Sequence, residues 1–210
     1  MNEEVEGHLR SLELLESKVK HSAKVLMQSG KGIYDLDFLA NAALNRTLST
    51  INGFLLLTRA NNFNCAAHLI RIHLDTFLRF AAAWLVDNPH EFARNILEGK
   101  KVSAMKDRAG VYMLDRNLKE KLSQLYPWVE KVYDEASGYI HLSDKHIFNS
   151  SALKDGGTLA FSISSEDRFV SDASRIEATE LMIEITNCIC HFANEYSIAK
   201  DNQINLDDEG

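Results

Sequence analysis

The chain has 210 residues, of which 45% are hydrophobic and 25% are charged, and its formal net charge is −7 at pH 7. This size and balance fit one globular domain that can bury a core without disulfides, and the acidic charge argues against broad coating of nucleic acid. The longest apolar stretch, residues 80–86, is far shorter than the roughly 20 residues that span a bilayer. The acidic start, MNEEVEGHLR, does not fit a secretory signal. We therefore expect a cytoplasmic protein that does not bind membranes.

Six or seven helices are predicted from the spacing of apolar residues at three and four positions. Glycines 30 and 32 end the first helix, Pro89 opens a short fourth helix and Pro127 opens a later one. The chain between residues 100 and 115 is ambiguous. In chain order, the expected helices cover residues 2–29, 35–60, 65–86, 89–98, 116–126, 128–141 and 173–199.

One small β-hairpin is expected near residues 146–163, because two short extended runs flank the glycine turn KDGG. Short connections favour antiparallel neighbours, so the fold class is an all-α, antiparallel helical bundle with this single hairpin. Residues 1–200 are expected to form one domain, and residues 201–210 a flexible acidic tail.

The third predicted helix carries Arg71, Asp75 and Arg79 at steps of four, so the three side chains stack along one face. Charges on so apolar a helix need partners, and an ion-pair ladder that joins two helices is one interpretation. The other is an anion pocket, because the planar guanidinium group suits phosphate or carboxylate.

A second set, Tyr133, Ser137 and His141, follows the same spacing on the helix after Pro127. A histidine at a helix C-terminus is stabilised by the helix dipole without any function, and it can equally act in a site. His146 is a weaker candidate.

The basic stretch is a further candidate, either as a solvated surface or as a phosphate site. It comprises Lys100, Lys101, Lys106, Arg108, Arg116, Lys119 and Lys121. In the last helix, Glu184 and His191 belong to a polar stripe that reads most simply as the solvated face, and we expect no metal and no cofactor.

The segments AAHLIRIHLDTFLRF and YDEASGYIHLSDKHI resemble bacterial helical proteins of the HEPN (higher eukaryote and prokaryote nucleotide-binding) superfamily, including abortive-infection proteins of the AbiV type. The resemblance covers residues 40–195 and implies a polar site made of Arg71, Asp75, Arg79, Tyr133, Ser137 and His141. It also implies dimers and, for many members, ribonuclease activity through an Arg followed by four to six residues and a His. No Arg in this chain has a His at that separation.

The sequence thus predicts a binding protein for a phosphate-bearing ligand, either a nucleotide or RNA, or for a partner protein, in bacterial defence or stress response. The alternative is a metal-independent ribonuclease in which His141 is the general acid or base and Arg71 or Arg79 stabilises the phosphate. A third hypothesis is a purely structural or assembly role as a homodimer, since HEPN-like bundles often dimerise.

Overall fold

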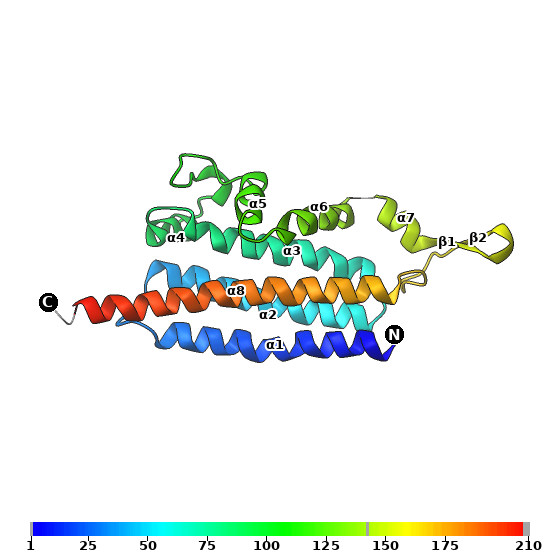
Figure 1. The fold of residues 1–210 in the computed structure, drawn as a ribbon, viewed down its shortest axis with the longest axis horizontal. Coiled ribbons are helices and arrows are strands. Elements are labelled where there is room, and N and C mark those ends of the chain that lie inside the picture. Colours follow the sequence, from blue (N-terminus) through cyan, green and yellow to red (C-terminus); the bar gives the residue numbers. More distant parts are fainter. Residues whose placement is uncertain (1, 142, 208–210) are drawn as a thin grey trace.

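Four long helices form the body of the protein (Figure 1). The computed structural model describes residues 2–141 and 143–207, with side chains as far as Asn202. The helices are α1 (Glu3–Gln28), α2 (Asp35–Arg59), α3 (Phe63–Ala81) and α8 (Asp172–Asp207). They pack in a ring, with α1 against α2, α2 against α3, and α8 between α3 and α1. The predicted helical bundle is therefore confirmed.

The direction of the last helix differs from a simple antiparallel pattern. Helices α1, α2 and α3 alternate in direction, but α8 runs parallel to α1 and α3 (Figure 1). Two hydrogen bonds fix this direction, since Lys18 binds Asn187 near the middle of α1 and Gly30 binds Asp201 just beyond its end. We define the excursion as the long segment between α3 and α8, residues 82–171. It returns the chain to the end of the bundle where α1 begins, so α8 must run the same way as α1.

Three helices begin directly after an asparagine that caps them. Asn2 accepts a hydrogen bond from the N–H of Val5, and Asn62 accepts one from Cys65. Because Asn62 is the cap, α3 begins at Phe63, two residues earlier than expected. Asn88 caps α4 (Pro89–Leu97) in the same way.

The excursion lies mainly against α3. After a 3-10 turn at Ala82–Trp84 come α4, a second 3-10 turn at Val102–Ala104, α5 (Asp115–Ser123) and α6 (Trp128–Ile140). Helices α5 and α6 pack on α3, whereas α4 packs on α2. The rings of Phe77, Tyr126, Trp128 and Phe192 pack together where the excursion meets α3 and α8.

The chain then leaves the body as an arm, which we define as residues 143–163. It contains α7 (Asp144–Ser150), β1 (Ser151–Lys154), a 3-10 turn at Asp155–Gly157 and β2 (Thr158–Phe161), and it projects beyond the end of the bundle (Figure 1). The hairpin is confirmed, with Leu153 opposite Leu159. The prediction that residues 146–150 are extended was wrong, because the Ser143 hydroxyl and the His146 side chain form a capping box that starts a helix there.

Two buried polar contacts connect the core helices. The His73 ring of α3 lies 2.9 Å from the Thr186 hydroxyl of α8. Lys200 of α8 forms an ion pair at 2.9 Å with Asp37 of α2, and both side chains are buried. The boundary predicted at residue 200 therefore falls inside α8, which extends to Asp207. The predicted flexibility of residues 208–210 lies outside the described residues.

Within the part of the chain that the structure describes, no helix is both long enough and apolar enough to cross a membrane.

Candidate functional site

The predicted arginine ladder exists, and it has a partner that the sequence did not indicate. Arg79 Nε donates to Asp75 at 2.8 Å, and Arg79 Nη2 donates to Asp115 of α5 at 2.7 Å. Arg71 lies 3.9 Å from Asp75 and 3.6 Å from Asp115. Two guanidinium groups therefore share two carboxylates, and the cluster is electrically neutral.

The arginine ladder contacts the second predicted set, Tyr133, Ser137 and His141, through one residue of that set. The guanidinium carbon of Arg71 lies 4.2 Å above the centre of the Tyr133 ring, a cation–π contact between α3 and α6. Ser137 remains within its own helix, where its hydroxyl donates to the carbonyl of Tyr133. Arg71 is only 14% exposed, so its contacts join α3, α5 and α6. This geometry matches the ion-pair interpretation better than an open anion pocket.

His141 lies away from the arginines. It is exposed at the C-terminus of α6, and eight residues of helix beyond Tyr133 correspond to about 12 Å. The same end of α6 brings Tyr139 against Phe63, at the start of α3, whereas Arg79 lies in the last turn of α3. Among the described residues, no contact joins His141 to either arginine.

Most of the basic stretch is neutralised. Arg116 pairs with Glu120, and Lys121 with the buried Asp107. Lys119 contacts Glu130 and Asp134, while Arg108 contacts Asp87. Among the described residues, Lys100 and Lys106 have no acidic partner, and both line the same cavity.

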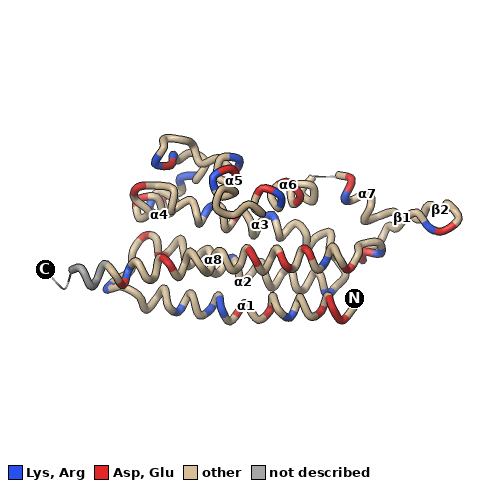
Figure 2. Tube along the Cα trace, viewed as in Figure 1, with Lys and Arg blue, Asp and Glu red and all other residues tan. Residues whose placement is uncertain are grey.

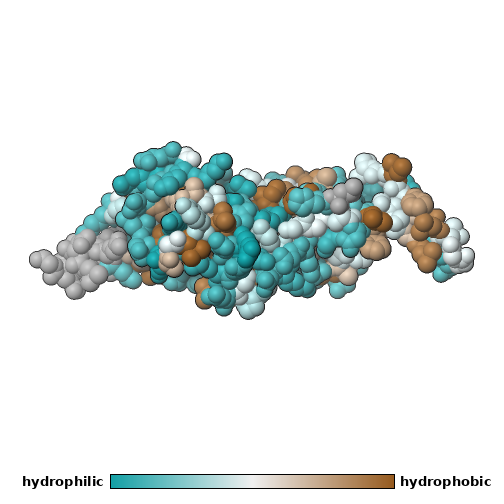
Figure 3. Space-filling view, turned by 90° about the horizontal axis from the view of Figure 1, so that it is seen from above, coloured by the Kyte–Doolittle hydropathy of each residue, from teal (hydrophilic) through white to brown (hydrophobic). Residues whose placement is uncertain are grey.

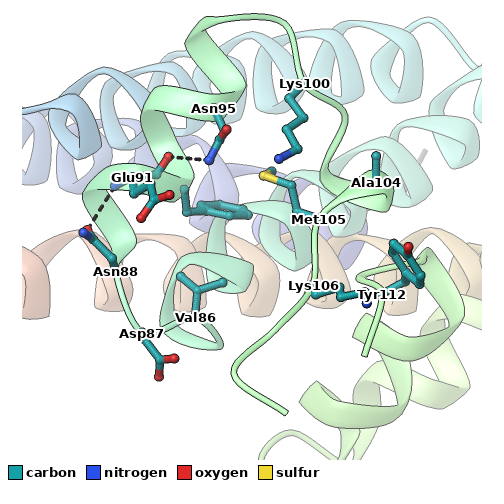
Figure 4. Close-up of a pocket in the computed structure, with 11 residues that line it drawn as sticks. Val86, Asp87, Asn88, Glu91, Asn95, Lys100, Ala104, Met105, Lys106 and Tyr112 are labelled. Atoms are coloured by element: carbon teal, nitrogen blue, oxygen red, sulfur yellow. Dashed lines mark hydrogen bonds between the residues drawn. The ribbon is translucent and has the colours of Figure 1, made fainter. Parts of the chain in front are cut away.

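This cavity, of about 430 Å³, opens between α4 and residues 100–112. The buried side chains of Phe92 and Met105 give it an apolar floor. Figure 4 shows Asp87, Asn88 and Glu91 on the side of α4, with Lys100, Lys106 and Tyr112 across from them. The cavity thus has an acidic side, a basic side and an aromatic ring, and Lys106 Nζ lies 4.9 Å from the centre of that ring.

A tight turn holds the basic side in place. The Asp107 carboxylate accepts hydrogen bonds at 2.9 Å from the N–H groups of Ala109 and Val111. Burial opposes ionisation of this carboxyl, but Lys121 and these two N–H groups outweigh it and hold the pKa of Asp107 below its usual range. Arg108 fastens the turn to the body through the carbonyls of Trp84 and Val86.

Sequence reasoning found the two lysines but not the cavity. The lysines belong to the predicted basic stretch, but Asn88, Glu91 and Tyr112 were not among the predicted site residues. The sequence signal that could have indicated the basic side of the cavity was the turn Asp107-Arg108-Ala109-Gly110. Gly110 adopts a φ of +79°, and the turn brings Tyr112 beside Lys106.

The polar stripe of α8 makes contacts with α1. Glu180 lies 3.4 Å from His8, and Asn187 accepts a hydrogen bond from Lys18. Within the described residues, no group of three or more His, Cys, Asp or Glu side chains is arranged to hold a metal ion.

Comparison with family models, curated proteins and solved structures gave no match. The resemblance to HEPN-like proteins therefore stays a prediction, and the geometry of the chain itself must support any function.

Proposed function

We propose that this protein binds a small phosphate-bearing ligand, of the nucleotide class, in the cavity between α4 and residues 100–112. The observation that carries the proposal is the convergence of Lys100 and Lys106, which have no acidic partner among the described residues, on this one cavity. Arg116, Lys119 and Lys121 of the same stretch are each paired with a carboxylate, and Lys101 lies outside the cavity. Two ammonium groups provide six N–H donors for phosphate oxygens.

The rest of the cavity suits the remainder of a nucleotide. Its volume of about 430 Å³ falls within the range of small-molecule sites, about 300–1,000 Å³. The apolar floor of Phe92 and Met105 and the exposed Tyr112 ring offer surfaces on which a base can pack. Glu91, on the opposite side, can accept hydrogen bonds from a ribose hydroxyl or an exocyclic amine.

The test is a calorimetric titration with AMP, ADP, ATP and inorganic phosphate, with adenosine as the phosphate-free control. We expect the phosphate compounds to bind, and the double variant Lys100→Gln/Lys106→Gln to bind them about tenfold or more weakly. Lys101→Gln is the matched control, because Lys101 is an exposed neighbour outside the cavity. Equal losses in both variants, or binding of none of the phosphate compounds by the wild-type protein, would contradict the proposal.

The ribonuclease alternative has less support, because it needs His141 and an arginine at one phosphate. His141 and the arginine ladder have no contact among the described residues, and both arginines already bind carboxylates.

A further inference from the structure

The arm exposes an unusual amount of apolar side chain for its size. Within the hairpin, Leu153 is 75% exposed, Leu159 54% and Phe161 75%. Ile147 and Phe148 of α7 are also exposed, and so is Ile163 just after β2. Figure 3 shows these hydrophobic residues gathered at the projecting end of the molecule.

The strand register puts the three large hairpin residues on one face. Leu153 and Leu159 are directly opposite each other, and Phe161 lies two residues beyond Leu159 on the same strand. Side chains alternate between faces along a strand, so the other face carries the small pair Ala152 and Ala160. An isolated two-stranded hairpin is at best marginally stable in water, and such sheets gain stability when an apolar face is packed against something.

Charge distinguishes the arm from the body. Between Lys145 and Glu166 the only charged side chains are Lys154 and Asp155, adjacent residues of opposite sign at the tip. Figure 2 shows the strands uncharged up to this tip, while acidic and basic residues cover the helices. The arm is therefore neutral, although the whole chain carries a net charge of −7.

We infer that the arm is a self-association site, where the apolar face of one hairpin packs against the same face of a second copy. Two acidic bodies repel one another, but neutral arms that project beyond the bundle let two copies meet with their bodies apart. The hairpin offers no net charge by which a charged partner could be steered. Its face can complement itself about a two-fold axis, which brings the Leu153–Leu159 pair of one copy onto that of the other.

The test is sedimentation of the full-length protein over a range of concentrations. We expect a reversible dimer, and expect Leu153→Ser/Leu159→Ser to weaken it by about tenfold or more. Leu14→Ser is the matched control, because Leu14 is a similarly exposed leucine of α1, at 74%. A monomer at every concentration, or a dimer weakened as much by the control as by the arm variant, would overturn the inference.

A charge-swap pair separates loss of association from damage to the hairpin. Leu159→Lys and Leu159→Glu should each be monomeric, because the two-fold axis brings the Leu153–Leu159 pairs of the two copies, and therefore the like charges, together, whereas their mixture should form a mixed dimer. A mixture that stays monomeric while both variants keep the wild-type circular dichroism would also overturn the inference. Nucleotide binding by these variants should equal that of the wild type, since the arm does not line the cavity.

Discussion

His73 is the buried titratable group with the clearest physical consequence. Its ring is fully buried in α3, and burial lowers the pKa of His73 from 6.5 to about 3. The Thr186 hydroxyl donates to the carbonyl of Met182, so Thr186 is the acceptor for His73 Nε2–H. Among the residues that the structure describes, His73 Nδ1 has no hydrogen-bond partner, which matches a neutral ring.

The depressed pKa of His73 makes stability fall with acid. Between pH 6.5 and about 3 the His73 ring is protonated in the unfolded chain but neutral in the folded protein. The free energy of unfolding therefore decreases as pH falls through this window. From pH 7 to pH 5 the contribution is about 2 kcal/mol, at about 1.4 kcal/mol per pH unit. Urea unfolding at the two pH values measures the difference, and His73→Gln should reduce it.

The comparison variant for this prediction is His21→Gln, because His21 is exposed on α1. This variant should keep the wild-type dependence on pH. If both variants lose stability with acid as steeply as the wild type does, the neutral buried ring is not the cause.

At the scale of the elements, the helices whose signals are local could be predicted from the sequence, and features that depend on distant parts of the chain could not. Periodicity and capping residues located the starts of the seven predicted helices to within two residues, because each of these signals is local, whereas the predicted ends of α3 and α8, residues 86 and 199, were wrong by five and eight residues. The start of α7 was missed, since its capping box depends on a histidine in the third helical position, where Glu or Gln is usual. The parallel direction of α8 could not be read locally, because it depends on the whole excursion between α3 and α8.

In the candidate site, too, the contacts within one helix could be predicted from the sequence, and the contacts between helices could not. Spacing along α3 correctly placed Arg71, Asp75 and Arg79 on one face, but the fourth member, Asp115, comes from another helix. No pattern in one sequence indicates that distant pairing, which converts an apparent anion pocket into a neutral cluster. That Lys100 and Lys106 have no acidic partner among the described residues could be seen only once the ion pairs of the other basic residues were known.

We predict that the neutral cluster stabilises the packing of α5 and α6 on α3. Arg71→Ala removes the contact with Tyr133 and leaves two carboxylates with one guanidinium group, so it should cost about 1–3 kcal/mol of unfolding free energy. Arg116→Ala is the control, since Arg116 is 81% exposed in its pair with Glu120 and should stay close to wild type. Chemical denaturation measures both.

A stable Arg71→Ala protein that has lost nucleotide binding would reverse the assignment of this cluster. It would show that the guanidinium group binds a ligand, as the anion-pocket interpretation of the sequence allowed. Binding that is lost only in the Lys100 and Lys106 variants would keep ligand and scaffold functions in separate parts of the molecule.

At the scale of the whole molecule, the two proposed functions lie in different parts: ligand binding in the acidic body and self-association in the neutral arm. The ligand cavity lies in the excursion beside α4, and the arm extends from the end of the molecule away from α4 (Figure 1). Association through the arms would leave the cavities open to solvent in both copies. Ligand binding and dimer formation should then be independent of each other.

This division predicts how salt affects association. Each copy carries a net charge of −7, so two bodies repel one another, and the screening length falls from about 10 Å at 0.1 M salt to about 3 Å at 1 M. Salt should weaken this repulsion and leave the apolar contact between the arms intact, so the dimer should become tighter as sodium chloride is raised. Sedimentation at several salt concentrations measures the effect. A dimer that dissociates with salt would instead indicate an interface held by ion pairs, such as those on the charged helices, and would exclude the arm.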